Sequence, residues 1–233
     1  MSFLRFRPAF VELAEPERNH TSGIVQGDCI TVMRGMAAAS VDMILTDPPY
    51  LVSYRDRSGR TLANDNNPAF VKPALAEMGR VLTQDGVCVL FCGWAALHHF
   101  APAWTGAGFT VKGQLVFVKP YASSARTVAC RHESAFVLSK GAPRRIGRAL
   151  PDVLPWHYSG NRLHPTEKAV NTLLPLIRAF CPEGGMVLDP FCGSGSTVAA
   201  ALACGRRGVG IDIDPQHVKT ASARMKALVR GSA

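Results

Sequence analysis

Ten residues, 41–50, constrain the fold of this chain most, because an apolar run ends abruptly at Asp47-Pro48-Pro49-Tyr50. The run is short, as expected of a buried parallel strand, and the two prolines cannot continue a ladder because they lack an N–H. The Asp47 carboxylate and the Pro48 carbonyl can then accept hydrogen bonds from one exocyclic amine, while Tyr50 stacks on its ring. A strand that ends in a turn with a core tyrosine would show the same pattern, so this motif alone leaves both interpretations open.

The composition excludes several classes of protein. A length of 233 residues suits one α/β domain, a hydrophobic content of 47% excludes a disordered chain, and no apolar run approaches the roughly 20 residues that span a bilayer. The N-terminus lacks the apolar core of a signal peptide and the seven cysteines include no C-x-x-C pair, so we expect a cytoplasmic protein with reduced thiols. The net charge of +9 favours a polyanionic partner such as nucleic acid.

From Gly23 onward the chain alternates between strand and helix patterns, which indicates βαβ units. We predict strands at residues 23–28, 41–46, 87–91, 111–118, 186–189 and 208–212, an antiparallel strand at 133–138, and helices at 29–36, 70–82, 94–105 and 166–180. Gly86 is expected to end the second helix in the left-handed conformation. Residues 51–68 are polar and predict a mobile, substrate-binding loop; residues 1–22 form an extension of unknown role, and residues 23–233 a single domain.

A second signal lies at residues 186–197, where a strand pattern runs into a glycine-rich turn that opens a helix. Gly193 and Gly195 allow a ligand to approach the backbone closely, and the helix N-terminus offers unpaired N–H groups. Seventeen residues after Gly195, the last predicted strand ends in Asp212, the position from which a carboxylate binds a ribose diol in doubly wound folds. The arrangement predicts a nucleotide-like cofactor. Phosphoryl transfer is not expected, because no Gly-Lys-Ser/Thr follows the glycines.

Together, Asp47-Pro48-Pro49-Tyr50 and residues 189–196 resemble the motifs of the DNA amino-methyltransferases that use S-adenosylmethionine. The acidic tetrapeptide precedes the cofactor loop, which is the circularly permuted order of the β group of that family. The resemblance extends from residue 23 to about residue 229. It implies a Rossmann-like class I methyltransferase fold of the α/β class, with a mostly parallel seven-stranded sheet, one antiparallel strand and helices on both faces. Both turns would then lie at the carboxyl ends of neighbouring strands.

The resemblance also implies roles for individual residues. It implies catalysis by Asp47, Pro48, Pro49 and Tyr50. It implies cofactor binding by Asp28, Cys29, Asp47, His164, Thr166, Lys168, Asp189, Phe191, Cys192, Gly193, Ser194, Gly195, Ser196, Thr197, Asp212 and Ile213. In that set, residues 164–168 are similar to the motif that helps to hold the methionine end of the cofactor, Asp28 to the acidic position near the adenine, and Asp212 to the ribose-binding position. Residues 131–133 resemble a weaker motif of the family, and Ala169 stands where the family often has proline.

The implied reaction is methyl transfer to the N6 amine of adenine in double-stranded DNA. Asp47 and the Pro48 carbonyl would localise the nitrogen lone pair, and Tyr50 would stack on a target base flipped out of the duplex. Cytosine N4 is the alternative target, although an Asp at the first motif position favours adenine in this family. Methylation at cytosine C5 needs a Pro-Cys pair, whereas this chain has Cys181-Pro182. The family often forms homodimers.

Other functions fit the sequence less well. Methyltransferases that act on RNA or on protein glutamine usually have Asn in place of Asp47 and the unpermuted motif order. A cofactor-binding protein without catalysis would need a broken motif, and none is broken. The histidines at positions 98, 99, 132, 157 and 164 lack the spacing of zinc ligands, so no metal is predicted.

Residues 140–163 interleave basic and aromatic side chains, including Trp156 and Tyr158, where the family usually has a larger target-recognition domain. We expect phosphate contacts from Arg55, Arg57, Arg60, Arg144, Arg145, Arg148 and Arg162. So short a segment predicts a short or relaxed recognition sequence, because each bidentate base contact adds only about 1–3 kcal/mol of discrimination. The alternative is that part of the segment packs on the sheet, and that the 51–68 loop or a partner subunit completes the reading surface.

Overall fold

A computed structural model describes residues 22–55, 59, 63–123, 127–143, 146, 149–160, 163 and 167–231. Its strands are β1 (Gly23–Gln26), β2 (Val41–Thr46), β3 (Leu82–Phe91), β4 (Thr110–Val118), β5 (His132–Ser139), β6 (Val153–Pro155), β7 (Met186–Asp189) and β8 (Arg207–Asp212). They form one sheet in the order β1-β8-β7-β2-β3-β5-β4-β6. In this sheet β5 runs antiparallel to both of its neighbours, and every other pairing is parallel.

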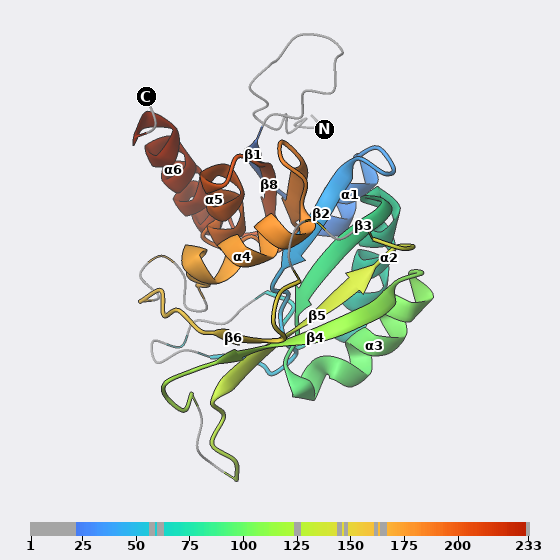
Figure 1. Cartoon of the computed structure of the whole chain (residues 1–233), viewed down its shortest axis with the longest axis vertical. Helices are drawn as coiled ribbons and strands as arrows, with labels where there is room; N and C mark the ends of the chain where they lie inside the picture. Colours follow the sequence, from blue (N-terminus) through green and yellow to red (C-terminus); the bar gives the residue numbers. More distant parts are fainter. Residues whose placement is uncertain are drawn as a thin grey trace, which may run out of the picture.

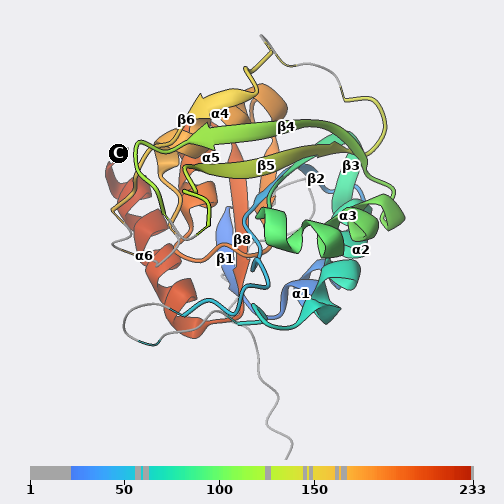
Figure 2. The ribbon, with the colours of Figure 1, turned by 90° about the horizontal axis from the view of Figure 1, so that it is seen from below.

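Helices cover both faces of the sheet. They are α1 (Cys29–Arg34), α2 (Val71–Val81), α3 (Leu97–Gly106), α4 (Val170–Phe180), α5 (Ser196–Ala203) and α6 (Pro215–Gly231), with short 3-10 turns at Pro68–Phe70 and Trp94–Ala96. Figures 1 and 2 show α1, α2 and α3 on one face and α4, α5 and α6 on the other. This is the α/β architecture that the resemblance implied, a mostly parallel sheet with one antiparallel strand and helices on both faces.

The central strands are buried on both faces because their side chains alternate between two apolar clusters. In β2, Met43 and Leu45 pack with α4 and α5, whereas Ile44 packs with α1, α2 and α3. In β3, Val89 likewise packs with α4 and α5, whereas Leu90 packs with α1, α2 and α3. This double burial explains why these strands appear in the sequence as continuous apolar runs.

The sheet has eight strands rather than the seven that were predicted. The additional strand is β6, which lies in the 140–163 segment and extends the sheet edge beside β4, so part of that segment joins the sheet, in line with the alternative interpretation of the segment. The backbone N–H of Val116 donates to the carbonyl of Asp152 at 2.7 Å, and that of Trp156 to Val118 at 3.1 Å. Pairing with an exposed edge strand fixes a segment that has little hydrophobic periodicity of its own, which is why the sequence did not predict it.

The prediction that Gly86 ends α2 in the left-handed conformation is wrong. The helix ends at Val81, and Leu82 is already extended and begins β3. Asp85 takes the left-handed turn instead, at φ 65°, and its carboxylate accepts a hydrogen bond from the N–H of Ala142 at 2.8 Å. Gly86 is required by packing, because a Cβ there would lie 2.7 Å from the Leu82 side chain.

Two helix boundaries also differ. The helix predicted at residues 29–36 ends at Arg34, with Gly35 as its C-cap. The helix predicted at 166–180 begins at Val170, because residues 167–169 are not helical and Ala169 is an extended N-cap at ψ 137°. The side chains of Glu167 and Lys168 make long-range ion pairs described below, and an extended backbone presents them to those partners.

Hydrogen bonds join parts of the loop at residues 51–68 where the structure describes it. Asp65 is 2% exposed, and its carboxylate accepts hydrogen bonds from the N–H groups of Leu51 at 2.8 Å and Tyr54 at 2.5 Å. One buried acid therefore ties the two arms of the loop together. Residues 56–58 and 60–62 of the loop lie outside the described residues, as do residues 1–21 of the N-terminal extension. Among the helices of the described ranges, none has the length and apolar character needed to cross a membrane.

Candidate active site

The two sequence motifs lie side by side at the carboxyl edge of the sheet. Strands β2 and β7 are parallel neighbours, with Met43 opposite Val187 and Ile44 opposite Leu188. The Asp47–Tyr50 turn follows β2, and the glycine-rich turn follows β7. A buried hydrogen bond of 2.8 Å from the Thr46 hydroxyl to the Asp189 carboxylate joins the two strand ends across 143 residues of sequence. The expected juxtaposition of the two turns is confirmed.

One cavity of about 930 Å³ contains both turns. The side near β1 and β8 is lined by Gly27, Asp28, Cys29, Asp212, Ile213, Asp214 and His217. Its middle is lined by Asp47, Pro48, Pro49, Tyr50, Lys168, Asp189, Phe191, Cys192, Gly193, Ser194, Ser196 and Thr197, and the side near β4, β5 and β6 by Lys119, Tyr121, Ser123, Glu133, Trp156 and Tyr158. The predicted cofactor residues therefore gather in one cavity, except that Gly195 does not line it and that His164 and Thr166 lie outside the described residues.

Asp47 is paired with a cation that the sequence did not place beside it. One carboxylate oxygen of Asp47, Oδ2, accepts a hydrogen bond from the Nζ of Lys168. The other oxygen, Oδ1, is buried and has no hydrogen-bond partner within the described part of the chain. Lys168 also lies over the ring of Phe91, with Nζ 5.1 Å from the ring centroid.

The ring of Tyr50 lies against the backbone of Gly93. A Cβ built on Gly93 would be 3.1 Å from Cδ2 of Tyr50, so a glycine leaves room for the ring at this point. The Tyr50 hydroxyl is buried beside the Asp47 carboxylate and makes no hydrogen bond of good geometry among the described residues. Burial, followed by the nearby Asp47 and Glu133 carboxylates, raises the pKa of Tyr50 well above its usual value, so the phenol stays protonated.

Asp189 is a buried carboxylate with donors on several sides. Its Oδ1 accepts hydrogen bonds from the Thr46 hydroxyl at 2.8 Å and from the N–H of Phe191 at 3.2 Å. Burial raises the pKa of Asp189 from its ordinary 3.8 to about 6, against the lowering effect of hydrogen bonds from Thr197, Thr46 and Phe191. The Asp189 carboxyl group is therefore ionised at neutral pH, and burial of its charge lowers the stability of the native state.

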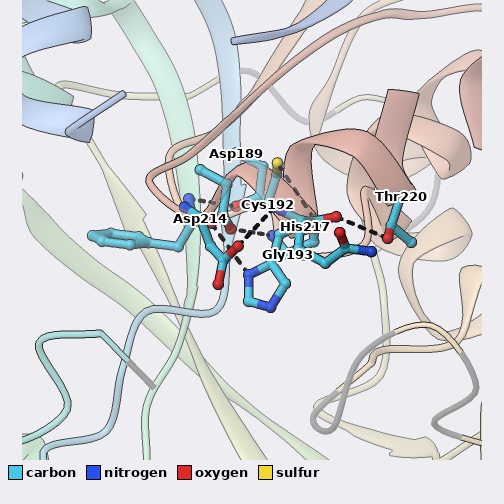
Figure 3. A network of polar contacts seen from close by, with 9 residues as sticks. Asp189, Cys192, Gly193, Asp214, His217 and Thr220 are labelled. Atoms are coloured by element: carbon cyan, nitrogen blue, oxygen red, sulfur yellow. Dashed lines mark hydrogen bonds and ion pairs between the residues drawn. The ribbon is translucent and has the colours of Figure 1, made fainter. Parts of the chain in front are cut away.

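The two acids predicted near the adenosine end of the cofactor have structural partners. The Asp212 carboxylate accepts hydrogen bonds from the N–H of Gly193 at 2.8 Å and of Asp214 at 2.9 Å, and Nδ1 of His217 lies 3.2 Å from it. Figure 3 shows Gly193 of the glycine-rich turn beside Asp214 and His217 at the start of α6. Asp28 is the N-cap of α1, accepting a hydrogen bond from the N–H of Thr31 at 2.9 Å.

The glycine-rich turn has the backbone conformation that its glycines predicted. Gly193 and Gly195 have φ values of 49° and 77°, in the left-handed region. A Cβ on Gly195 would lie 2.9 Å from the Cβ of Ala221 on α6, so the turn packs directly on that helix. This explains why Gly195 supports the cavity without lining it.

An ion pair that sequence reasoning missed connects this turn to α6. Arg224 on α6 donates to the Glu167 carboxylate at 2.9 Å and to the hydroxyl of Ser196 at 3.0 Å. The backbone carbonyl of Glu167 in turn accepts a hydrogen bond from the Ser159 hydroxyl at 2.8 Å. Glu167 belongs to the 164–168 motif, but Arg224 had no sequence signal because it lies on a polar helix far from either motif.

A second missed cluster lies under β4, β5 and β6. Lys119, which is 3% exposed, pairs with Glu133 and donates to the Ser123 hydroxyl at 3.2 Å. The Nζ atoms of Lys119 and Lys168 lie 5.5 and 5.9 Å from the ring centroid of Trp156. Nε1 of Trp156 is buried and has no partner in the described ranges. Trp156, predicted as part of a DNA-binding surface, therefore forms a wall of the cavity.

Of the predicted phosphate-binding arginines, the structure describes Arg55, which is exposed. The others, Arg57, Arg60, Arg144, Arg145, Arg148 and Arg162, lie outside the described residues. Tyr158 is 62% exposed, and its ring meets that of Tyr121 edge-on at 6.0 Å beside the cavity. In the part of the chain that the structure describes, no three His, Cys, Asp or Glu side chains gather as metal ligands do.

Two curated relatives from Escherichia coli (strain K12) are similar over most of the chain. "Putative methylase YubD" is 51% identical over 209 residues, which cover 90% of this chain and 92% of the relative. "DNA adenine methyltransferase YhdJ" is 27% identical over 254 aligned positions, with coverage of 91% and 85%.

Two solved structures share the fold. The M1.HpyAVI–SAM complex aligns with a TM-score of 0.69 and 21% identity, covering 87% of this chain and 98% of that one. The PvuII DNA methyltransferase, named as cytosine-N4-specific, aligns with a TM-score of 0.73 and 15% identity, covering 90% and 91%. A family model described as DNA methylase, of the N6/N4 type, matches residues 41–154 and 145–223. By its match to that model and its identity to the methylase relative, the chain belongs to the N6/N4 family of DNA methylases.

Proposed function

We propose that this protein transfers a methyl group from S-adenosylmethionine to the exocyclic N6 amine of adenine in DNA, with Asp47-Pro48-Pro49-Tyr50 as its catalytic turn. The observation that carries the proposal is the buried Thr46–Asp189 hydrogen bond, which fixes the amine-binding turn beside the glycine-rich turn in one cavity. Membership of the N6/N4 DNA methylase family supports the reaction class.

The cavity fits S-adenosylmethionine in size and charge. S-adenosylmethionine supplies a methyl group on a positively charged sulfur. The carboxylates of Asp28, Asp47, Asp189, Asp212 and Asp214 line the cavity and favour a cation. A carboxylate has about four acceptor positions, so Asp212 can still accept from a ribose hydroxyl beyond its three present partners.

This assignment of Asp212 predicts that Asp212→Ala raises the dissociation constant of S-adenosylhomocysteine about tenfold or more, because a charged hydrogen bond is worth roughly 1.5–3 kcal/mol. Isothermal titration calorimetry measures it. An unchanged dissociation constant would remove Asp212 from the cofactor site.

Asp47 and the Pro48 carbonyl are the acceptors for the target amine. The lone pair of an aromatic amine is delocalised into its ring, so the nitrogen is a weak nucleophile until hydrogen bonds to its N–H groups localise that pair. Oδ1 of Asp47, buried and unpartnered among the described residues, is the acceptor for one of those N–H groups. The gain comes from positioning and preorganised electrostatics, terms worth roughly 7–11 and about 3–4 kcal/mol.

The target base has to leave the duplex, because the Asp47 side chain is only 21% exposed within the cavity. Adenine is favoured because Asp47 occupies the first motif position and because one relative is named a DNA adenine methyltransferase. The second candidate is the N4 amine of cytosine, which the fold shared with a cytosine-N4-specific enzyme favours.

We also propose a short or relaxed recognition sequence. The reading surface is smaller than the 140–163 segment, because β6 pairs with β4 and Trp156 packs toward the cavity. Exposed groups such as Arg55 would contact phosphates, which contribute affinity without sequence information.

The test is incubation of the purified protein with unmethylated DNA and labelled S-adenosylmethionine, followed by nucleoside analysis and long-read methylation mapping. The proposal predicts N6-methyladenine at adenines with one or two preferred neighbours. Labelled N4-methylcytosine would establish the second candidate, and no label in DNA would reject the function. One fully methylated motif of four or more defined bases, with negligible methylation elsewhere, would reject the relaxed specificity.

A further inference from the structure

The carboxylate proposed to accept the target amine already has a nitrogen donor. Lys168 pairs with Oδ2 of Asp47, and its side chain is 10% exposed. Aromatic rings lie close to the ammonium, with the centroids of Phe91 and Trp156 at 5.1 and 5.9 Å. A donor nitrogen on Asp47, flanked by aromatic rings, is the environment that the target amine itself would occupy.

Three buried polar atoms near this ammonium make no hydrogen bond of good geometry in the described ranges: Oδ1 of Asp47, the hydroxyl of Tyr50 and Nε1 of Trp156. The Tyr50 hydroxyl and the Asp47 carboxylate lie close enough to interact with each other, whereas Nε1 of Trp156 has no such neighbour among the described residues. Buried polar groups in native proteins are nearly always paired, so three together need an explanation. All three residues line the cavity. A polar heterocycle with an amine would offer hydrogen bonds to these atoms, but in this structure the Lys168 ammonium occupies the place beside Asp47.

Lys168 in this place would disfavour methyl transfer. The amine nitrogen gains positive charge as it attacks, and an ammonium on the same carboxylate opposes that charge. The lysine therefore needs another anionic partner when the reaction occurs. The backbone that carries it is held in place, because Glu167 is anchored by Arg224 and Ser159, so the long side chain is the part that moves.

We propose that Lys168 changes partner, from Asp47 in the cofactor-free enzyme to the methionine carboxylate of S-adenosylmethionine in the loaded enzyme. This rests on the proposed function. Departure of the ammonium frees Asp47 and opens the space beside Tyr50 and Trp156 for the flipped base. Lys168 is thus a positioning residue that makes capture of the target base depend on prior binding of the cofactor. A fixed ion pair, which only orients Asp47, is the competing explanation.

Two ligands that differ in the methionine carboxylate separate these explanations. S-adenosylhomocysteine has the carboxylate, and 5′-methylthioadenosine lacks it. In calorimetric titrations, Lys168→Met should raise the dissociation constant of S-adenosylhomocysteine about tenfold or more and leave that of 5′-methylthioadenosine within about twofold. Lys168→Arg, which keeps the charge, should restore part of the loss. Equal effects of Lys168→Met on both ligands would overturn the proposal.

Base capture gives a second readout that does not depend on turnover. A duplex with 2-aminopurine at a mapped methylated adenine becomes fluorescent when that base leaves the stack. With the wild-type protein, S-adenosylhomocysteine should increase the signal at least tenfold, whereas saturating 5′-methylthioadenosine should not. Lys168→Met should capture the base without any cofactor.

The matched control is Lys72→Met, because Lys72 is an exposed lysine of α2 that does not line the cavity. It should behave as wild type in both assays. Identical capture with the two ligands, or no cofactor-free capture by a folded Lys168→Met protein, would refute the exchange even if the wild-type protein methylates DNA. If the wild-type protein labels no DNA, the proposed function fails instead.

Discussion

Replacing Asp189 by Asn should stabilise the protein above pH 6. Burial raises the pKa of this carboxyl group from its ordinary 3.8 to about 6, so the native state holds the proton more tightly than the unfolded chain does. Between about pH 4 and pH 6 the native state therefore binds more protons, and the free energy of unfolding falls as the pH rises through that window. At higher pH the Asp189 carboxyl group is ionised in both the native and the unfolded state. The native state is then destabilised by the full cost of burying this charge.

The size of the effect follows from that difference in pKa. The interval between 3.8 and about 6, at about 1.4 kcal/mol per pH unit, corresponds to about 3 kcal/mol. An amide in the same place has no charge to bury, and its oxygen can accept the existing hydrogen bonds from Thr46 and Phe191. We expect Asp189→Asn to be more stable than wild type by about 3 kcal/mol at pH 8. At pH 5 the difference should be roughly half of that.

Urea unfolding of both proteins at pH 5, 6, 7 and 8 measures the difference. The control is Asp152→Asn, because Asp152 is exposed and its substitution should leave the pH dependence unchanged. S-adenosylmethionine should bind Asp189→Asn more weakly, since a cavity-lining negative charge that favours its positively charged sulfur is lost. A stability difference that is negligible, or that does not grow between pH 5 and pH 8, would refute the assigned origin of the pKa.

Three further changes test the site. Asp47→Ala should lower the rate of methyl transfer at least about 100-fold and change the affinity for S-adenosylhomocysteine only modestly. Tritium incorporation measures the rate and calorimetry measures the affinity. Near wild-type turnover would exclude Asp47 as the amine acceptor. Gly93→Ala, whose Cβ would lie 3.1 Å from the ring of Tyr50, should lower kcat about tenfold or more at unchanged cofactor affinity, and normal steady-state kinetics would show that the ring position is unimportant. Arg224→Met should lower the free energy of unfolding, measured in urea, by about 2–4 kcal/mol, because it leaves the buried Glu167 carboxylate without its cation. The double variant with Glu167→Gln should recover part of that loss, since removing both charges costs less than removing one. Additive losses would contradict the pairing.

Much of the fold could be predicted from short stretches of sequence. The central strands carry continuous apolar runs because both of their faces are buried, and the turns are marked by Asp47-Pro48-Pro49-Tyr50 and by glycines that adopt positive φ. The resemblance to the DNA amino-methyltransferases then implied that the two turns lie on neighbouring strands, as the pairing of β2 with β7 confirms. Each of these signals is local, or depends on the direction that parallel strands must share.

The errors arose where a distant contact outweighed the local pattern. Residues 153–155 have no strong strand signal, yet they pair with β4 because that edge offers unpaired backbone groups. Residues 167–169 are extended although they precede a helix, and Glu167 and Lys168 make long-range ion pairs there. Asp65 accepts two backbone hydrogen bonds within the polar loop at residues 51–68, contacts that no periodicity reveals.

By itself, therefore, the sequence determined the class of fold, the two turns and the chemistry that their residue types allow. Only the tertiary structure decided which charged side chains pair. Lys168 pairs with Asp47, which is 121 residues away in the sequence, and Arg224 pairs with Glu167, which is 57 residues away. The physical reason is that ion pairs and cavity walls depend on side chains from separate elements, which approach one another only after the sheet has formed. The pairing of Lys168 with Asp47, and with it the proposed order of cofactor and base binding, is a property of that assembled edge.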